Sequence, residues 1–173
     1  VTFNILEHPD KLTSVGQALP GVEIKILNPD ATQAGEIHLK SPMLMKGYLN
    51  QEDVQLFNTG DIGYLDEDNF LYILNRRKDI IISGGENIYP KEIEDLLYSL
   101  EGVVECALVP QEDETWGQVP LLFYAGSPDA QEITNFLSQH LAKYKLPRQI
   151  IKMNALPKNA SGKILRKNLK NEA

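Results

Sequence analysis

Three short stretches carry residues whose type and spacing can do chemistry, and each of them contains glycine. In Asn58-Thr59-Gly60-Asp61 a carboxylate follows a glycine turn. An Asp in that position can accept hydrogen bonds from two neighbouring hydroxyls, such as those of a ribose. It can equally cap the backbone of its own turn, which is the commoner use of a turn Asp. The spacing alone therefore leaves a sugar-binding role and a structural role open for Asp61.

The second stretch, Ser83-Gly84-Gly85, lets the backbone approach a ligand closely. Glycine has no Cβ and adopts positive φ without strain. A plain tight turn ahead of a helix explains the same residues equally well. The stretch is not a Walker A phosphate loop, because the Gly-x-x-x-x-Gly-Lys-Ser/Thr pattern is missing from it. Gly84 and Gly85 are therefore candidates for contact with a ligand, but not for a phosphate cradle of that type.

The third stretch, Ser161-Gly162-Lys163, lies in a basic part of an acidic chain. Residues 143–170 contain nine Lys or Arg and no Asp or Glu, whereas the formal net charge of the whole chain is −7. Such a segment suits an anionic partner: a nucleotide, coenzyme A, a nucleic acid or a membrane surface. Lys163 on a glycine-flexed loop can act as a mobile cation for a carboxylate or phosphate. A helix cap with a surface lysine on a solvated face is the structural alternative.

Composition excludes several classes of protein. The chain has 173 residues, of which 42% are hydrophobic, enough for one ordinary domain or two small ones. No apolar run reaches the roughly 18 residues of a membrane span, and the first residues lack the pattern of a signal peptide. The single cysteine, Cys106, cannot form an intrachain disulfide and indicates a reducing, cytoplasmic compartment. The chain does not begin with Met, so we expect it to be a piece of a longer protein.

The catalytic groups of self-contained enzymes are not apparent in the sequence. The three histidines, His8, His38 and His140, are too far apart for metal-ligand spacing and are expected to be structural or on the surface. No pair of carboxylates, Ser-His-Asp set or Cys-His set stands out. The residues by themselves thus predict a protein that binds anions through basic residues and glycine-containing loops, with no metal site.

Two styles of secondary structure are expected along the chain. Alternating apolar and polar residues before position 75 predict short antiparallel strands joined by tight turns. Residues 1–77 are therefore expected to form the end of a β-barrel-like subdomain that is itself incomplete. Beyond the charged residues 76–79, the order β-α-β-β-α-β predicts a small α+β domain over residues 78–173, with a central mixed sheet flanked by helices. One helix is expected to begin at Pro90, and another with Ser127 as N-cap and Pro128 as its first residue.

Taken together and in order, these stretches resemble the C-terminal part of the acyl-adenylate-forming enzymes, the superfamily of acyl-CoA synthetases and adenylation domains. Each matching stretch is weak alone, but seven in the same order over almost the whole chain are specific. They comprise residues 35–37 with 46–48, 59–61, 76–79, 83–88 with 92–94, 116–117, 141–147 and 156–166.

The resemblance implies roles for residues near the nucleotide. Asp61 would hold the ribose hydroxyls, with Arg76 beside it on the nucleotide. Lys78 would be the hinge on which a small C-terminal domain swings between two poses, one for each half-reaction. Lys163 would be catalytic, reaching the reacting groups while the adenylate forms.

The resemblance also implies a second ligand and a reaction. Gly84 and Gly85 would line the tunnel for the pantetheine of coenzyme A, with Trp116 nearby. Such enzymes join a small-molecule carboxylic acid to AMP, using ATP and Mg²⁺, and then transfer the acyl group to the thiol of coenzyme A. No nucleic acid or membrane takes part, so both of those partners are excluded by this reading.

The chain departs from the superfamily in ways that limit what it can do. The Ser/Thr/Gly-rich phosphate loop and the Thr-Glu motif whose Glu helps to place Mg²⁺ are missing, so the Mg²⁺ ligands are expected upstream. Most of the acid pocket is expected upstream as well, and the chain is therefore expected to be inactive alone. The acid stays open between several acyl and aryl acids, and a carrier-loading adenylation domain is the alternative to a CoA ligase. A basic nucleic-acid-binding module is disfavoured because aromatic residues do not interleave with the basic segment.

Overall fold

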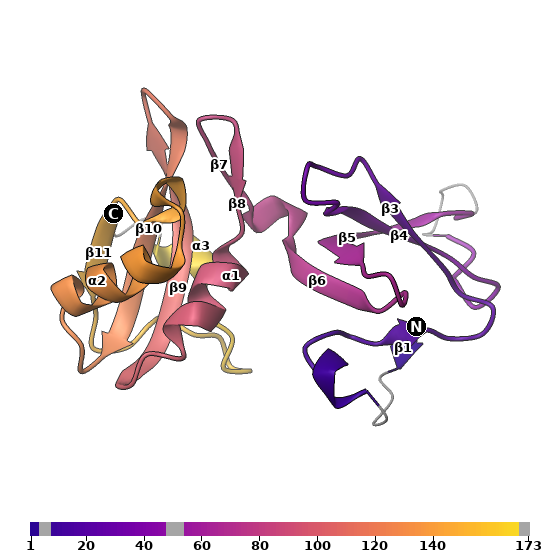
Figure 1. Cartoon of the computed structure of the whole chain (residues 1–173), viewed down its shortest axis with the longest axis horizontal. Helices are drawn as coiled ribbons and strands as arrows, with labels where there is room; N and C mark the ends of the chain where they lie inside the picture. The colour runs from indigo at the N-terminus through magenta and orange to yellow at the C-terminus, as the bar shows by residue number, and fades with distance from the viewer. Residues whose placement is uncertain (4–7, 48–53, 170–173) are drawn as a thin grey trace. The chain divides into compact units, whose positions relative to one another are not determined.

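A computed structural model describes residues 1–3, 8–47 and 54–169 (Figure 1). The chain divides into two compact units, Val1–Lys78 (unit 1) and Asp79–Ala173 (unit 2). The division falls one residue beyond the boundary expected at 77/78. In the described part of the chain, no helix is long and apolar enough to cross a membrane.

Unit 1 is built on an open sheet of four antiparallel strands that follow one another in sequence order (Figure 1). The strands are β3 (Glu23–Leu27), β4 (Gly35–Lys40), β5 (Phe57–Leu65) and β6 (Leu71–Arg76), with the two-residue strands β1 (Thr2–Phe3) and β2 (Gln17–Ala18) forming a separate pair. Alternation along the strands buries Ile37, Leu39 and Leu71 on one face. Within the described residues the sheet does not close into a barrel, so the expected end of a β-barrel is an open sheet.

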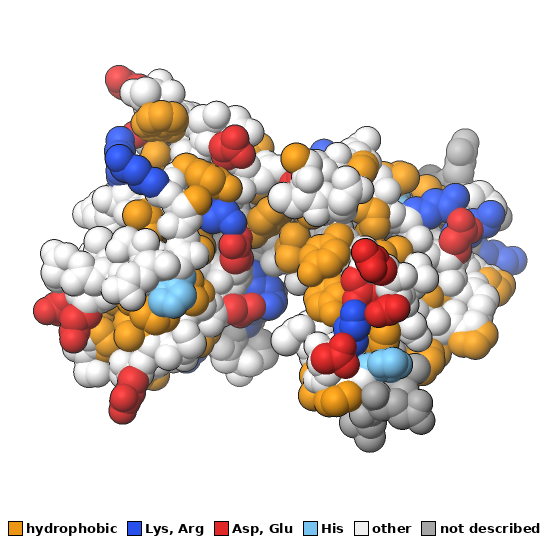
Figure 2. All heavy atoms as spheres, in the orientation of Figure 1, with side chains coloured by type: hydrophobic (Ala, Val, Ile, Leu, Met, Phe, Trp, Pro, Cys, Tyr) orange, Lys and Arg blue, Asp and Glu red, His pale blue; other side chains and the backbone are white. Residues whose placement is uncertain are grey.

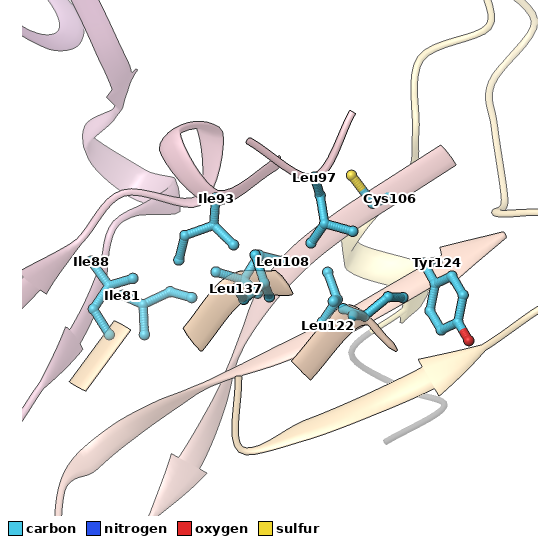
Figure 3. Packing of buried hydrophobic residues seen from close by; sticks show 10 residues of the cluster. Ile81, Ile88, Ile93, Leu97, Cys106, Leu108, Leu122, Tyr124 and Leu137 are labelled. Carbon is cyan, nitrogen blue, oxygen red and sulfur yellow. The ribbon is translucent and has the colours of Figure 1, made fainter. Parts of the chain in front are cut away.

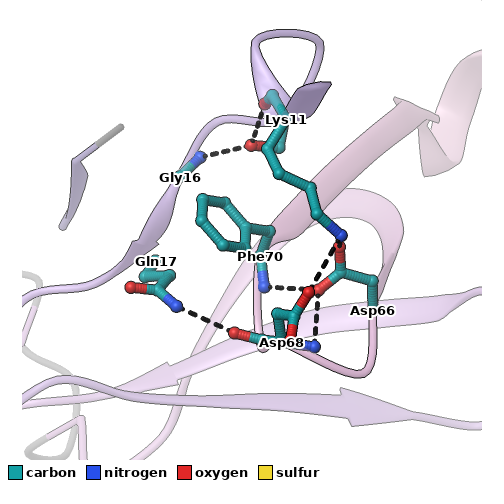
Figure 4. Close-up of polar contacts among 7 residues, drawn as sticks. Lys11, Gly16, Gln17, Asp66, Asp68 and Phe70 are labelled. Atoms are coloured by element: carbon teal, nitrogen blue, oxygen red, sulfur yellow. Dashed lines mark hydrogen bonds and ion pairs between the residues drawn. The ribbon is translucent and has the colours of Figure 1, made fainter. Parts of the chain in front are cut away.

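The first residues of unit 1 are tied to the turn between β5 and β6 by charge (Figure 4). Lys11, at the end of the 3₁₀ turn η1 (Pro9–Lys11), pairs with Asp66 at 2.8 Å and with Asp68 at 3.1 Å. These two carboxylates raise the pKa of Lys11. Asp66 also accepts hydrogen bonds from the backbone N–H groups of Asp68 and Phe70. The same carboxylate thus orders its own turn and fixes the N-terminal segment.

Unit 2 is the mixed sheet with flanking helices that the sequence predicts. Its sheet runs in the order β11-β10-β7-β8, with β9 also paired to β10. β10 and β11 are parallel, whereas the other pairs are antiparallel. The elements are η2 (Arg77–Asp79), which crosses the boundary, then β7 (Ile81–Ser83), β8 (Glu86–Ile88), α1 (Pro90–Leu97), β9 (Val103–Asp113), β10 (Gly117–Gly126), α2 (Ala130–His140), η3 (Lys143–Lys145), β11 (Gln149–Lys152) and α3 (Arg166–Leu169).

Alternate residues of the long β9–β10 hairpin serve two different cores. Leu108 and Leu122 face the helices α1 and α2, whose buried residues include Leu97 and Leu137 (Figure 3). The intervening residues belong to a second cluster, which contains Leu156 and Leu169 from the C-terminal segment. Because successive side chains of a strand point to opposite faces, the helices cover one face of the sheet and the C-terminal segment covers the other.

The start of α2 differs from the expected one. The helix begins at Ala130, and its N-cap is Asp129 rather than Ser127. Asp129 accepts a hydrogen bond from the N–H of Glu132 at 2.9 Å, and the Glu132 carboxylate accepts one from the N–H of Asp129 at 2.9 Å. This reciprocal capping box satisfies two helix-end donors at once, which explains why it prevails over a single Ser cap.

Leu97→Ala should destabilise unit 2 by about 2–5 kcal/mol, because the side chain is fully buried between α1 and the sheet and its removal leaves a cavity. Urea unfolding followed by the fluorescence of Trp116, the single tryptophan of the chain, measures this change within unit 2. Val104→Ala is the matched control, because Val104 is 69% exposed and its truncation should cost less than about 0.5 kcal/mol. Equal destabilisation by the two substitutions would contradict the described core.

Candidate functional site

Asp61 and Arg76 lie side by side on neighbouring strands of unit 1. They are cross-strand partners in the β5–β6 register. The Nε of Arg76 donates to Oδ1 of Asp61 at 2.8 Å, and its Nη1 donates to the carbonyl oxygen of Thr59 at 3.2 Å. The Asp61 side chain is 17% exposed, so the carboxylate is fixed but not sealed from solvent. The carboxylate therefore pairs with a guanidinium across the sheet, and within the described residues it accepts no hydrogen bond from its own backbone.

The expected turn at Asn58-Thr59-Gly60-Asp61 is wrong: these residues lie inside β5. Gly60 has φ of +73°, and the side chains of Asn58 and Thr59 accept hydrogen bonds from the N–H groups of Gly60 and Asp61. A glycine at positive φ inside a strand marks a local irregularity that re-aims the next side chain. Gly60 and Arg76 line a shallow hollow of about 510 Å³ together with Arg77 and Lys78.

Lys78 is the last residue of unit 1 and lies in η2. The residue before it, Arg77, pairs with Glu36 of β4 at 3.0 Å. Glu36 also accepts a hydrogen bond from the side chain of Asn58. The chain is thus fastened to the sheet of unit 1 immediately before the expected hinge.

Gly84 and Gly85 form the two-residue loop of a β-hairpin, not a turn that leads into a helix. Ser83 and Glu86 are the flanking partners of β7 and β8. The φ values of the two glycines, +58° and +87°, are those of a type I′ turn, which needs positive φ at both central positions. A Gly-Gly pair directly after a β-branched run such as Ile80-Ile81-Ile82 is a recognised signal for a two-residue hairpin loop, so the sequence contained it.

Gly84 lies directly against Trp116. A Cβ at Gly84 would meet Cε3 of the indole at 2.7 Å, and the N–H of Gly84 donates to the carbonyl oxygen of Trp116 at 2.9 Å. Both residues line a groove of about 530 Å³. Its other lining residues include Lys143, Tyr144 and Arg148, but not Gly85. The groove therefore combines a bare backbone, two aromatic rings, two cations and the carboxylate of Glu86.

Lys163 lies on an exposed loop that is closed by a one-residue bridge between Lys158 and Ile164, shortly before the helix α3. The side-chain Oδ1 of Asn159 accepts hydrogen bonds from the N–H of Lys163 at 2.9 Å and from the N–H of Ser161 at 3.1 Å. Among the described residues, the Lys163 ammonium has no ion-pair partner. The loop is therefore ordered while its cation stays free.

Three of the nine cations of the basic segment form ion pairs inside unit 2. Lys145 pairs with Glu92 at 2.6 Å, Lys158 pairs with Glu105, and Arg166 makes a two-pronged pair with Glu94. Lys158 and the N–H of Leu156 hold the pKa of Glu105 below its ordinary value. Figure 2 shows acidic and basic side chains interspersed on the visible face of this unit. These three cations thus stabilise contacts within unit 2. The number of Lys and Arg residues in the segment therefore overstates the positive charge that is available to a ligand.

The Arg166–Glu94 pair is a feature that sequence reasoning missed. Glu94 has an 8% exposed side chain, and its carboxylate also accepts the N–H of Leu108 at 2.7 Å. Arg166 further donates to the carbonyl oxygen of Leu108 at 2.9 Å. The partners lie 72 positions apart in the chain, so no local pattern connects them.

The predicted site residues fall into three places. Asp61 and Arg76 meet in unit 1, Gly84 and Trp116 meet in unit 2, and Lys163 lies on a separate loop of unit 2. No group of three or more His, Cys, Asp or Glu in the described part of the chain could hold a metal ion.

Gly84→Ala should change the fluorescence of Trp116, because the new methyl group would stand 2.7 Å from the indole and must displace it. Gly85→Ala is the matched control: it carries the same kind of backbone strain at positive φ, but nothing lies within 4 Å of its Cβ position. Emission spectra of the folded chain should therefore shift for Gly84→Ala and match wild type for Gly85→Ala. Identical spectra for both variants would contradict the described contact.

The sequence matches known proteins along almost its whole length. Residues 92–163 match the AMP-binding enzyme C-terminal domain. The 2-succinylbenzoate–CoA ligase of Lactococcus lactis subsp. lactis (strain IL1403) is 66% identical over 171 residues, which cover 98% of this chain and 38% of the relative. The enzyme of the same name from Geobacillus sp. (strain WCH70) is 46% identical, over 92% of this chain and 36% of the relative. The chain thus spans little more than a third of the length of these relatives.

Solved structures show the same similarity. The o-succinylbenzoate–CoA synthetase (MenE) of Bacillus subtilis in complex with the acyl-adenylate OSB-AMP superposes with a TM-score of 0.84 at 42% identity, over 94% of this chain and 36% of that chain. The same enzyme in complex with ATP and magnesium ion gives a TM-score of 0.84 at 41% identity, over 95% of this chain and 37% of that chain. By sequence and by fold, the chain carries the AMP-binding enzyme C-terminal domain and is similar over almost its whole length to 2-succinylbenzoate–CoA ligases.

Proposed function

We propose that this chain is part of an ATP-dependent acid–CoA ligase that forms an acyl-adenylate and then a CoA thioester. The acid is o-succinylbenzoate, so the enzyme serves menaquinone biosynthesis in the cytoplasm. The observation that carries the proposal is the 66% identity to a 2-succinylbenzoate–CoA ligase over 98% of the chain. The stretches IISGGENIYP, WGQVP and LAKYKLP favour the same ligase among its superfamily.

The Asp61–Arg76 pair suits a nucleotide. Arg76 occupies one carboxylate oxygen of Asp61 through its Nε, so the partly exposed carboxylate keeps acceptor positions for ribose hydroxyls. The guanidinium is 58% exposed and lines the hollow beside Gly60, where it can attract phosphate charge. In this role Asp61 binds and orients the sugar, and Arg76 both holds Asp61 in place and faces the nucleotide.

Lys163 supplies charge stabilisation in the first half-reaction. The substrate carboxylate attacks the α-phosphorus of ATP, an acyl–phosphate bond forms, and pyrophosphate leaves. Negative charge builds up between the carboxylate and the α-phosphate, and an ammonium placed there stabilises the transition state. The lack of an ion-pair partner for Lys163 among the described residues leaves this cation available. Lys78 is the hinge that lets unit 2 bring Lys163 to the reaction and then withdraw it.

The groove at Gly84 and Trp116 suits coenzyme A in the second half-reaction. The thiol attacks the acyl carbon, a thioester forms, and AMP leaves. Gly84 lets the thin pantetheine arm pass close to the backbone, with Gly85 next to it in the hairpin loop. Lys143 and Arg148 offer positive charge for the phosphates of the same ligand. The described residues contain no carboxylate set that could hold Mg²⁺, and its ligands are expected in another part of the enzyme.

In the full-length enzyme, Lys163→Ala should slow formation of the o-succinylbenzoyl adenylate by about 10²–10³, the effect of losing one transition-state donor. Thioester formation from supplied adenylate should stay close to wild type, because Lys163 then has no charge to stabilise. Pyrophosphate release and coenzyme A consumption measure the two steps. Lys167→Ala, which removes another exposed lysine of the same segment, is the control and should affect neither step. Equal losses in both steps would refute the assignment of Lys163 to one half-reaction.

The acid and the thiol are tested with the same enzyme. A panel of aryl and alkyl acids with ATP should give rapid pyrophosphate release with o-succinylbenzoate, and free coenzyme A should accept the acyl group. If the enzyme prefers another acid, the proposal of an acid–CoA ligase stands, but o-succinylbenzoate is not its substrate. Transfer to the phosphopantetheine of a carrier protein in place of coenzyme A would favour the carrier-loading alternative.

The 173-residue chain alone should bind ATP or coenzyme A weakly and catalyse no ATP–pyrophosphate exchange. It has no glycine-rich phosphate loop and spans 38% of a relative that is 66% identical to it. Exchange assays with labelled pyrophosphate, run beside the full-length enzyme, measure this. Exchange by the isolated chain would mean that residues within it complete the adenylation site.

A further inference from the structure

The loop that carries Lys163 is closed by its own hydrogen bonds. The carbonyl oxygen of Asn159 accepts from the N–H of Gly162 at 2.9 Å, and the N–H of Asn159 donates to the carbonyl oxygen of Lys163 at 2.9 Å. The side-chain Oδ1 of Asn159 accepts hydrogen bonds from the N–H of Lys163 and from the N–H and the Oγ hydroxyl of Ser161. Asn159 therefore bonds to the backbone of Lys163 at two points and determines where its Cα lies.

The two ends of this loop are fastened to the sheet by carboxylates. Before the loop, Glu105 of β9 accepts the N–H of Leu156 at 3.0 Å and pairs with Lys158. After the loop, Arg166 is held by the buried carboxylate of Glu94, with a hydrogen bond of 2.7 Å from Nη2 to Oε2. Both carboxylates belong to elements that pack into the core of unit 2. The ends of the loop therefore move with the unit.

Apolar contacts complete the fastening. Leu156 and Leu169, on either side of the loop, are 4% and 0% exposed, and Ile164 packs against the same cluster. The neighbour of Ile164, Lys163, is exposed. An alternation of buried and exposed residues thus directs one side chain inward to the core and the lysine outward.

We propose that Asn159 and Glu105 are positioning residues for Lys163. The lysine is carried on a pre-ordered loop that moves with unit 2 as one body, and it is not a cation on a flexible arm. Pre-ordering removes the entropic cost of fixing the backbone at the moment of reaction, so only the rotamers of the lysine side chain have still to be ordered. This inference rests on the proposed role of Lys163 in adenylate formation and adds the residues that set its position.

The test compares three variants of the full-length enzyme in the two half-reactions. Asn159→Ala removes the acceptor that orders the loop, and a displacement of about 1 Å is expected to slow adenylate formation on the order of 10²-fold. Asn159→Asp keeps an oxygen acceptor in the same place and should retain most of the rate. Glu105→Gln keeps an acceptor for the N–H of Leu156 but loses the charge that pairs with Lys158, so its loss should be intermediate. Asp95→Asn, which breaks an exposed pair with Lys91 within α1, is the control and should not change the rate.

The ratio of the two half-reactions separates positioning from simple instability. A positioning role predicts slower adenylate formation with unchanged thioester formation from supplied adenylate. Equal loss in both steps would mean that unit 2 itself is damaged and would overturn the proposal. Equal loss for Asn159→Ala and Asn159→Asp would also overturn it, because the acceptor oxygen would then not matter.

Hydrogen exchange gives a second readout, on the 173-residue chain. The N–H groups of Ser161 and Lys163, which donate to the Asn159 side chain, should exchange faster in Asn159→Ala than in wild type, whereas those of β9 should be unchanged. Unaltered exchange at the loop would show that Asn159 does not order it. If Lys163→Ala leaves adenylate formation intact, the proposed function of Lys163 fails. If Lys163→Ala is impaired but Asn159→Ala is not, the positioning proposal alone fails.

Discussion

The organisation of unit 2 depends on the buried carboxylate of Glu94. It accepts the N–H of Leu108 and both prongs of the Arg166 guanidinium, which in turn donates to the carbonyl oxygen of Leu108. A helix, the central hairpin and the C-terminal segment thus meet at one ion pair. A buried carboxylate that loses its partner is strongly destabilising, whereas the complete pair contributes little net stability. The pair is therefore best understood as specifying where the C-terminal segment lies.

The basic segment shows how a charge count can mislead. Nine Lys or Arg without a nearby acid suggest a surface for polyanions. In the fold, Lys145, Lys158 and Arg166 reach back to carboxylates 53 to 72 positions earlier in the chain. The charge that these three side chains carry is therefore compensated within unit 2, and the cations left for a ligand include Lys143, Arg148 and Lys163. The ability to bind an anion thus belongs to individual side chains and not to the basic segment as a whole.

Local patterns were enough to predict much of the fold. Pro90 begins its helix as expected, because proline suits the first turn, and alternation predicted strands of unit 1 such as β3 and β4. The failures were also local, and each has a physical reason. The Gly-Gly pair was read as a turn into a helix although it closes a hairpin, and Asp129 outcompetes Ser127 as a cap through a reciprocal pair of hydrogen bonds.

The candidate site was less predictable, because it depends on register and on distant pairs. That Asp61 lies opposite Arg76 follows from the pairing of β5 with β6, which includes an irregularity that no sequence rule locates. The contact between Gly84 and Trp116 joins two hairpins, and nothing in the sequence near Lys163 indicated that the Asn159 side chain bonds to its backbone. The chemistry of individual residues was therefore visible early, but the residues that hold them in place emerged only in three dimensions.

The two faces of the β9–β10 hairpin restrict how this unit can vary in length. Leu108 packs beneath the helices, and its neighbour Val109 packs against the segment that leads to Lys163. A single residue inserted in either strand would turn every later side chain of that strand to the opposite face. Residues that now pack under the helices would then face the segment that leads to Lys163, and residues that now face this segment would lie under the helices. Insertions and deletions are thus expected at the tip of the hairpin around Trp116. Within the strands they are expected as two residues at a time, which keeps each later side chain on its original face. Among distant relatives, β9 and β10 should keep their length, whereas the loop at the tip should vary in length.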